Sequence, residues 1–123
     1  MARILVVEDD AEVREMIKRV LSDAGHSVVE ACNGNEALRF VSEQRFAVAI
    51  IDILMPECDG FETIQALKKT QSHLKILAIS GAPSFRSYSP LDAAETLGAH
   101  MSIAKPFDVT LLLKCTHQLL PQD

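Results

Sequence analysis

The sequence has few cysteines, no excess of basic charge and no long apolar run. The three cysteines, Cys32, Cys58 and Cys115, are an odd number at no metal-ligand spacing, which predicts free thiols in a reducing cytosol. The 12 lysines and arginines are outnumbered by 17 aspartates and glutamates, for a formal net charge of −5. The chain therefore lacks the basic stripe of a nucleic-acid binder, and we expect no contact with DNA or RNA.

No pattern of a membrane span or a signal peptide is visible. No apolar run approaches the roughly 18 residues that cross a bilayer. The first apolar run, residues 4–7, is cut off by three acids, which a signal peptide would not contain. We therefore expect a cytoplasmic protein without membrane contact. At 123 residues the chain has the length of one domain, which can bury roughly two-thirds of its unfolded surface.

Short apolar runs alternate with amphipathic stretches along the whole chain. The runs that predict strands are residues 3–7, 27–31, 46–51, 74–79 and 101–104. Helix-like spacing follows each run, over residues 13–21, 37–41, 61–69, 90–98 and 108–119. Asn33-Gly34-Asn35 and Asp59-Gly60 are typical of turns and loops. Five βα units whose strands are apolar on both faces predict an α/β fold, a doubly wound parallel sheet of order 2-1-3-4-5.

Polar side chains gather where these strands end. In such a sheet the carboxyl ends of the strands share one edge, where binding sites lie. The residues at these ends are Glu8, Asp9, Asp10, Asp52, Ser80 and Lys105. Each has an ordinary explanation alone, as a helix cap, a turn residue, a hydroxyl bonded to the backbone or a solvated charge. Together they are harder to dismiss, because packed carboxylates cost stability unless a cation lies among them.

The residue types at this edge suit magnesium and phosphoryl transfer. Mg²⁺ prefers carboxylate oxygens and keeps room for water and phosphate oxygens. A carboxylate beside Mg²⁺, a hydroxyl and a lysine can transfer a phosphoryl group, with Asp52 as the nucleophile and the cations neutralising the phosphoryl oxygens. The sequence therefore predicts a magnesium-dependent phosphoryl-transfer site.

Four motifs in order carry a resemblance to a known family. They are Ile4-Leu5-Val6-Val7-Glu8-Asp9-Asp10, Asp52-Ile53-Leu54-Met55-Pro56 with Asp59-Gly60, Ser80-Gly81, and Ala104-Lys105-Pro106-Phe107. From end to end the chain resembles the receiver domain of two-component response regulators, in its single-domain form. The resemblance implies a flavodoxin-like three-layer sandwich over residues 1–123, with no output domain.

The resemblance also implies the roles of individual residues. Asp52 would accept a phosphoryl group from a phosphohistidine on a sensor histidine kinase or a histidine phosphotransfer protein. Mg²⁺ would be held by Glu8, Asp9, Asp52 and the main-chain carbonyl of Leu54, while Ser80 and Lys105 would bind the phosphoryl oxygens. The bond between Lys105 and Pro106 would be cis. Such a chain is a switch, a monomer or weak homodimer that acts on an unknown downstream protein. It catalyses only its own phosphorylation and dephosphorylation.

Two features depart from the family pattern. Receivers carry tyrosine or phenylalanine three residues before the lysine, as a switch that moves inward, and here that position is Ser102. The interval from Ser80 to Lys105 is also longer than usual, and we assign the extra length to a loop over residues 82–89.

Three other functions are weaker alternatives. A magnesium-dependent aspartyl phosphatase needs a general acid two residues after its nucleophile, and Leu54 stands there. A flavin-binding domain needs neutral phosphate donors in its first loop, which here is acidic. A docking module without chemistry would not need the complete set of acids, hydroxyl and lysine. The four histidines show no spacing that would gather them into a site, and we predict surface or boundary roles for them: His26, His73, His100 and His117.

Overall fold

A computed structural model of the chain describes residues 2–55, 58–81, 95 and 98–121, with the backbone alone at residues 54–55 and 58–61. Its main sheet consists of β1 (Arg3–Val7), β2 (Ser27–Ala31), β3 (Val48–Asp52), β6 (Lys75–Ser80) and β7 (Met101–Ala104). Its helices are α1 (Ala11–Asp23), α2 (Gly34–Glu43), α3 (Gly60–Thr70) and α5 (Val109–Leu119). Two short strands, β4 (Leu54–Met55) and β5 (Cys58–Asp59), pair antiparallel.

The main sheet is parallel throughout and has the order β2-β1-β3-β6-β7. This confirms the predicted doubly wound topology. The central strands β1 and β3 pair in a register that sets Val7 opposite Ile51. The residues that follow, Glu8 and Asp52, therefore leave the sheet side by side.

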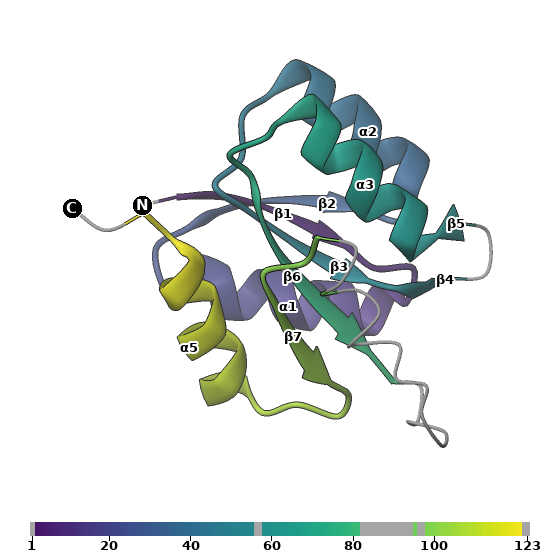
Figure 1. Cartoon of the computed structure of the whole chain (residues 1–123). Coiled ribbons are helices and arrows are strands. Elements are labelled where there is room, and N and C mark those ends of the chain that lie inside the picture. The colour runs from purple at the N-terminus through teal and green to yellow at the C-terminus, as the bar shows by residue number, and fades with distance from the viewer. Residues whose placement is uncertain (1, 56–57, 82–94, 96–97, 122–123) are drawn as a thin grey trace.

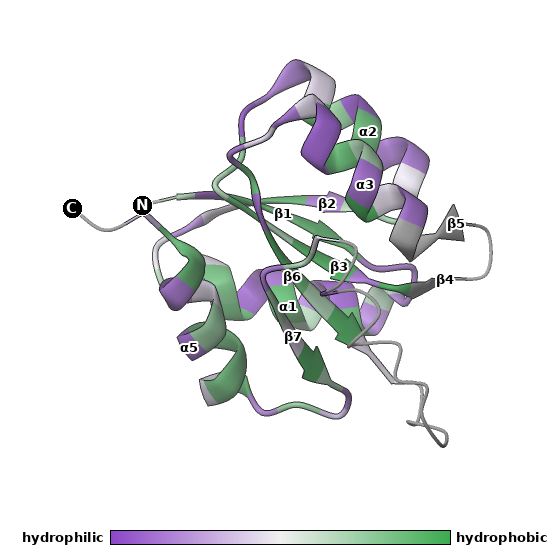
Figure 2. Cartoon of the chain, in the orientation of Figure 1, coloured by the Kyte–Doolittle hydropathy of each residue, from purple (hydrophilic) through white to green (hydrophobic). Residues whose placement is uncertain are grey.

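Helices cover both faces of the sheet, with α2 and α3 on one side and α1 and α5 on the other (Figure 1). Successive side chains of β1 point to opposite faces of the sheet, because side chains alternate along a strand. Leu5 and Val7 pack with α2 and α3, whereas Ile4 and Val6 pack with α1 and α5. The apolar residues thus concentrate on the strands and the inner helix faces, while α2 and α3 carry many polar residues and α5 is largely apolar (Figure 2), with Val109 and Leu111 exposed.

Side-chain caps fix where the helices begin. Asp10 caps α1 by accepting the N–H of Glu12 at 2.9 Å, as its position before the helix predicts. Asp108 caps α5 in the same way, through the N–H of Leu111 at 2.6 Å. Gly25 ends α1 with a φ of 95°, in the left-handed region that glycine adopts without strain.

Some predicted boundaries were wrong. Asn33 caps α2 and Gly34 begins that helix, where we expected a turn. The third strand begins at Val48, two residues later than predicted, because Phe46 donates its N–H to the Gln71 side chain at 3.1 Å. The expected loop around residues 54–59 contains the β4–β5 pair. Of the predicted fourth helix only Glu95 and Gly98 are described, and the loop over residues 82–89 lies outside the described residues.

In the described part of the chain, no helix has both the length and the apolar character that crossing a membrane requires. Two of the predicted free cysteines are confirmed, Cys32 at the surface and Cys115 in the core. The side chain of Cys58 lies outside the described residues.

Candidate functional site

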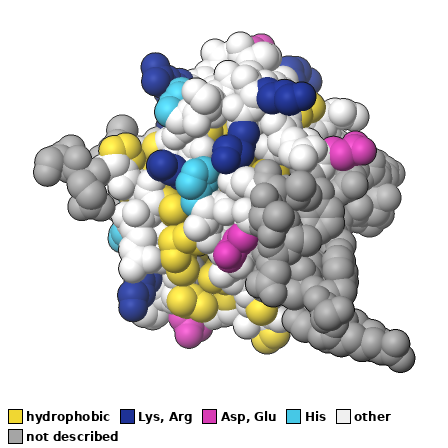
Figure 3. Space-filling view, in the orientation of Figure 1, with side chains coloured by type: hydrophobic (Ala, Val, Ile, Leu, Met, Phe, Trp, Pro, Cys, Tyr) yellow, Lys and Arg dark blue, Asp and Glu magenta, His cyan; other side chains and the backbone are white. Residues whose placement is uncertain are grey.

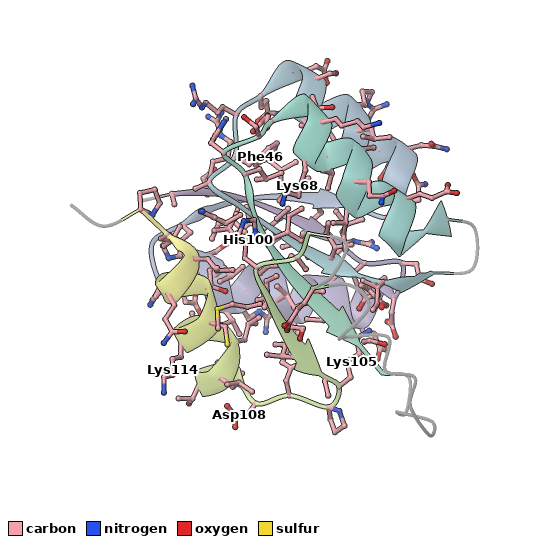
Figure 4. The ribbon with its side chains drawn as sticks, viewed as in Figure 1. Phe46, Lys68, His100, Lys105, Asp108 and Lys114 are labelled. Carbon is pink, nitrogen blue, oxygen red and sulfur yellow. The ribbon has the colours of Figure 1, made fainter. Side chains whose placement is uncertain are left out.

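The fold brings four of the predicted residues to the carboxyl edge of the sheet. Glu8 follows β1, and Asp52 and Ser80 are the last residues of β3 and β6. Lys105 follows β7, and its N–H donates to the carbonyl of Ser80 at 2.8 Å. Figure 4 shows Lys105 beyond the end of β7, at the opposite end of that strand from His100. The sequence-based assignment of these residues to one edge is therefore correct.

Lys105 joins the two buried carboxylates. Its Nζ lies 2.6 Å from Glu8 Oε1 and 3.1 Å from Asp52 Oδ2. The side chain of Glu8 is 0% exposed and that of Asp52 is 6% exposed. Two carboxylates removed from water this far need a cation beside them, and Lys105 provides one positive charge for the two.

A third carboxylate opens the cluster to solvent. Glu8, Asp9 and Asp52 each offer one oxygen, and these oxygens lie within 4.8 Å of one another. Asp9 is exposed, whereas its neighbour Asp10 turns away to cap α1. A set of oxygen donors that is partly open to water suits Mg²⁺, which keeps several water ligands. The residues present thus fit a hard divalent cation.

Burial and the contacts within the cluster shift the pKa values of Glu8 and Lys105. Burial raises the pKa of Glu8 to about 7; the hydrogen bond with Asp52 adds to this rise and Lys105 opposes it. Burial alone would lower the pKa of Lys105, but its hydrogen bonds with Glu8 and Asp52 outweigh burial and the pKa is raised. A divalent cation among the carboxylates would relieve the repulsion from Asp52, which adds to the effect of burial on the pKa of Glu8.

Three further features named from the sequence are Leu54, the Lys105–Pro106 bond and Ser102. The backbone of Leu54 lies in β4, directly after the β3 end that carries Asp52. The Lys105–Pro106 peptide bond is cis, as the resemblance implied. Ser102, at the position of the usual aromatic switch, lies on β7 and its hydroxyl donates to the Glu95 carboxylate.

Sequence reasoning missed Arg14, which supports the site from α1. Its Nη1 donates to the main-chain carbonyl of Glu8 at 2.7 Å. A basic residue one turn inside a helix is ordinarily a solvated charge, so only its spacing of six residues after Glu8 could have drawn attention to it.

The four histidines lie at the surface or at its boundary, as predicted, although two of them are close together. His26 and His117 come together, with 3.1 Å between their Nε2 atoms, although each lies away from the carboxyl edge of the sheet. His73 accepts the Nε–H of Arg45, and His100 accepts the N–H of Ile76 through Nδ1. Figure 3 shows lysine, arginine and histidine side chains gathered around α3 and the start of β7, where Figure 4 labels Lys68 and His100.

The response regulator receiver domain is the family whose model matches this chain, over residues 4–117. The chain therefore belongs to that family, and it is a phosphoacceptor signalling switch of the two-component type. Receiver domains bind Mg²⁺ at an acidic pocket, and in this chain Glu8, Asp9 and Asp52 form an acidic cluster.

Curated relatives include the response regulator MprA of Mycolicibacterium vanbaalenii, which is 39% identical over 119 residues. The match takes in 96% of this chain and 50% of that protein, and the same holds for MprA of Mycobacterium bovis. The chain thus spans about half the length of these relatives.

Solved structures match the fold over almost the whole chain. The chemotaxis protein CheY4 of Vibrio cholerae has a TM-score of 0.86 at 33% identity, covering 98% of this chain and 99% of that one. The response regulator TrrA of Thermotoga maritima, in complex with Mg²⁺-BeF, has a TM-score of 0.84 at 30% identity, covering 98% of this chain and 100% of that one. The flavodoxin-like architecture is confirmed.

Proposed function

We propose that Asp52 is the residue that accepts the phosphoryl group. The observation that carries this proposal is its surroundings: Asp52 ends the central strand β3, lies 3.1 Å from Lys105 Nζ and contributes an oxygen to the cluster with Glu8 and Asp9. A carboxylate nucleophile needs cations on both sides of the incoming phosphoryl oxygens, and this position offers one cation and a site for another.

The transfer uses groups already in place. A carboxylate oxygen of Asp52 attacks the phosphorus of a phosphohistidine, an O–P bond forms, the N–P bond breaks and the histidine nitrogen leaves with the electron pair. Lys105 turns its ammonium from the carboxylates toward a phosphoryl oxygen, and the hydroxyl of Ser80 donates to another. Asp52 and Ser80 are buried at the ends of β3 and β6, which keeps both side chains oriented, so little ordering of these two groups is needed during the reaction.

Mg²⁺ would be held by Glu8, Asp9 and Asp52 and by the main-chain carbonyl of Leu54. When bound, it supplies positive charge to the phosphoryl oxygens. The solved structure of TrrA, a response regulator with the same fold, is a complex with Mg²⁺-BeF, which supports magnesium binding by this chain.

The remaining assignments follow from this role. A response regulator domain interacts with histidine kinases or phosphotransfer proteins. We propose that residues 1–123 form a single receiver domain that works in the cytoplasm as a monomer or weak homodimer. Its phosphorylated form binds a downstream protein and turns over no metabolite.

The test is phosphorylation with acetyl phosphate and Mg²⁺, followed by borohydride trapping and mass spectrometry. The adduct is expected on Asp52, and Asp52→Asn is expected to abolish it. Asp10→Asn is the matched control, because Asp10 is the neighbouring acid that caps α1 and asparagine caps helices equally well. Labelling of Asp52→Asn to the extent of the parent would show the assignment to be wrong.

The phosphatase alternative has a separate measurement. The parent protein is expected to release one equivalent of nitrophenol per active chain from p-nitrophenyl phosphate, and further nitrophenol only as fast as its own aspartyl phosphate hydrolyses. Sustained turnover much faster than that hydrolysis, abolished by Asp52→Asn, would identify an enzyme instead of a switch.

A further inference from the structure

We propose that Arg14 is a positioning residue for the metal site: it holds the peptide that joins two of the ligands, Glu8 and Asp9. The inference rests on the Mg²⁺ site of the proposed function. It starts from one contact, the 2.7 Å hydrogen bond from Arg14 Nη1 to the main-chain oxygen of Glu8.

This oxygen lies between the two proposed metal ligands along the backbone. The carbonyl of Glu8 belongs to the peptide unit between Glu8 and Asp9, which is planar. Orienting this plane sets the directions in which both side chains leave the backbone. The bond from Arg14 therefore acts on both ligands at once, although Arg14 touches neither carboxylate in any contact that the structure records.

No other recorded backbone bond holds that carbonyl within the described residues. The N–H of Glu8 donates to the carbonyl of Ala31 at 3.0 Å and continues the pairing of β1 with β2. The N–H of Asp10 lies 3.4 Å from Oε2 of Glu8, a contact to the side chain and not to the carbonyl. The next recorded bond between two backbone groups, from Arg14 N–H to the carbonyl of Asp10 at 2.9 Å, already belongs to α1. Between the strand and the helix, the Arg14 side chain supplies the missing donor.

Arg14 is itself held in place. Its Nε lies 3.4 Å from Oε2 of Glu30 on β2, and Lys18 Nζ lies 3.5 Å from the other oxygen of Glu30. The side chain of Arg14 is 18% exposed, in contrast to 74% for Arg19 on the same helix. The planar guanidinium can donate to the Glu8 carbonyl and to Glu30 simultaneously, which a lysine ammonium on a flexible stem does less well.

The direction in which removal of Arg14 changes Mg²⁺ affinity distinguishes a positioning role from an effect of its charge. Arg14 is a cation near a site for a cation, so through its charge alone it repels Mg²⁺, and its removal would tighten metal binding. If Arg14 orients the ligands, its removal weakens metal binding even though the repulsion between Arg14 and Mg²⁺ is also removed. Loss of groups that orient metal ligands ordinarily costs 10-fold or more in affinity.

The experiment measures the Mg²⁺ dissociation constant by isothermal titration calorimetry and the unfolding free energy in EDTA by urea denaturation. The variants are Arg14→Met and Arg14→Lys, with Arg19→Met as the control, since Arg19 pairs only with Glu15 on the helix surface, at 3.8 Å. We expect a dissociation constant about 10-fold higher for Arg14→Met, an intermediate value for Arg14→Lys and no change for Arg19→Met.

Each outcome decides one point. Equal or tighter Mg²⁺ binding by both Arg14 variants, with metal binding intact in the parent, overturns the positioning role and leaves the metal site standing. Absence of Mg²⁺ binding by the parent at tens of millimolar overturns the metal site of the proposed function. If Arg14→Met does not fold, the Mg²⁺ affinity of Arg14→Lys tests the positioning role, because lysine keeps the positive charge and lacks the planar guanidinium that donates to two acceptors.

Discussion

His26 and His117 are 91 positions apart in the chain, yet their Nε2 atoms lie 3.1 Å from each other. The ring centroids are 5.3 Å apart, so the two nitrogens face each other nearly in line, as in an N–H···N hydrogen bond. The other nitrogen of His26, Nδ1, accepts the N–H of Ala2 at 3.3 Å. This assigns the proton of a neutral His26 to Nε2, where it is donated to His117.

The first prediction concerns the pKa of His26, which is lowered from its ordinary value of 6.5 by burial and then by His117. The unfolded chain then takes up a proton on His26 more readily than the folded protein does. The contribution of this residue to stability is therefore present above pH 6.5 and is lost as the pH falls below it. An NMR titration is expected to give a pKa for His26 below 6.5, and His117→Gln is expected to raise it.

His73→Gln is the control for this titration, since His73 contacts Arg45 elsewhere on the surface. A pKa of His26 at or above 6.5 in the parent would contradict the prediction.

The strand order and the site could be predicted from the sequence because both depend on local patterns. Runs such as Ile4–Val7 and Val48–Ile51 are apolar on both faces, and each is followed at once by an acid. Parallel pairing then places Glu8 and Asp52 together regardless of loop detail. The pair His26–His117 depends instead on where α5 packs against the turn before β2, a long-range relation that no spacing in the sequence encodes.

The contacts of Gln71 in the core are a second long-range feature that the sequence does not predict. It follows α3 and is buried, and its amide bonds three backbone groups in the last turn of α2 and the segment between α2 and β3. Nε2 donates to the carbonyls of Val41 and Gln44 at 2.9 Å and 2.6 Å, and Oε1 accepts the N–H of Phe46 at 3.1 Å. A polar residue after a helix reads from the sequence as a surface residue, so the delayed start of β3 was not foreseen.

The second prediction is that Gln71→Leu destabilises the fold by about 2–4 kcal/mol. The substitution leaves buried backbone groups without partners, each of which costs about 1–3 kcal/mol. Urea denaturation at neutral pH measures the change. Thr70→Ala, at the neighbouring exposed position, is expected to cost less than about 0.5 kcal/mol. Equal stability of Gln71→Leu and the parent would show that the turn between α2 and β3 does not need these bonds.

The third prediction is that Mg²⁺ stabilises the fold through the acidic cluster. The carboxylate oxygens of Glu8, Asp9 and Asp52 lie within 4.8 Å of one another, and a divalent cation removes their repulsion. At 100 times its dissociation constant, a ligand adds about 2.7 kcal/mol by mass action. Differential scanning calorimetry is expected to show a melting temperature that rises with Mg²⁺ in the parent and in Asp23→Ala. The rise should vanish in Asp9→Ala, and persistence of the full shift in that variant would place the metal elsewhere.

The fourth prediction is that Lys105 and Mg²⁺ compete for the same carboxylates. The Nζ of Lys105 lies within hydrogen-bond distance of Glu8 and Asp52, where it neutralises part of the charge that attracts the metal. In EDTA, Lys105→Met is expected to lower the free energy of unfolding by about 1–3 kcal/mol. This loss is smaller than that for breaking a fully buried ion pair, because Glu8 can take up a proton when the ammonium is absent. With saturating Mg²⁺ the difference in unfolding free energy between the variant and the parent should shrink, and the variant should bind Mg²⁺ several-fold more tightly.

Urea denaturation with and without Mg²⁺ measures both effects. Lys114→Met, an exposed position on α5 that Figure 4 labels, should change neither quantity. Weaker Mg²⁺ binding by Lys105→Met would mean that the ammonium orients the carboxylates for the metal instead of competing with it.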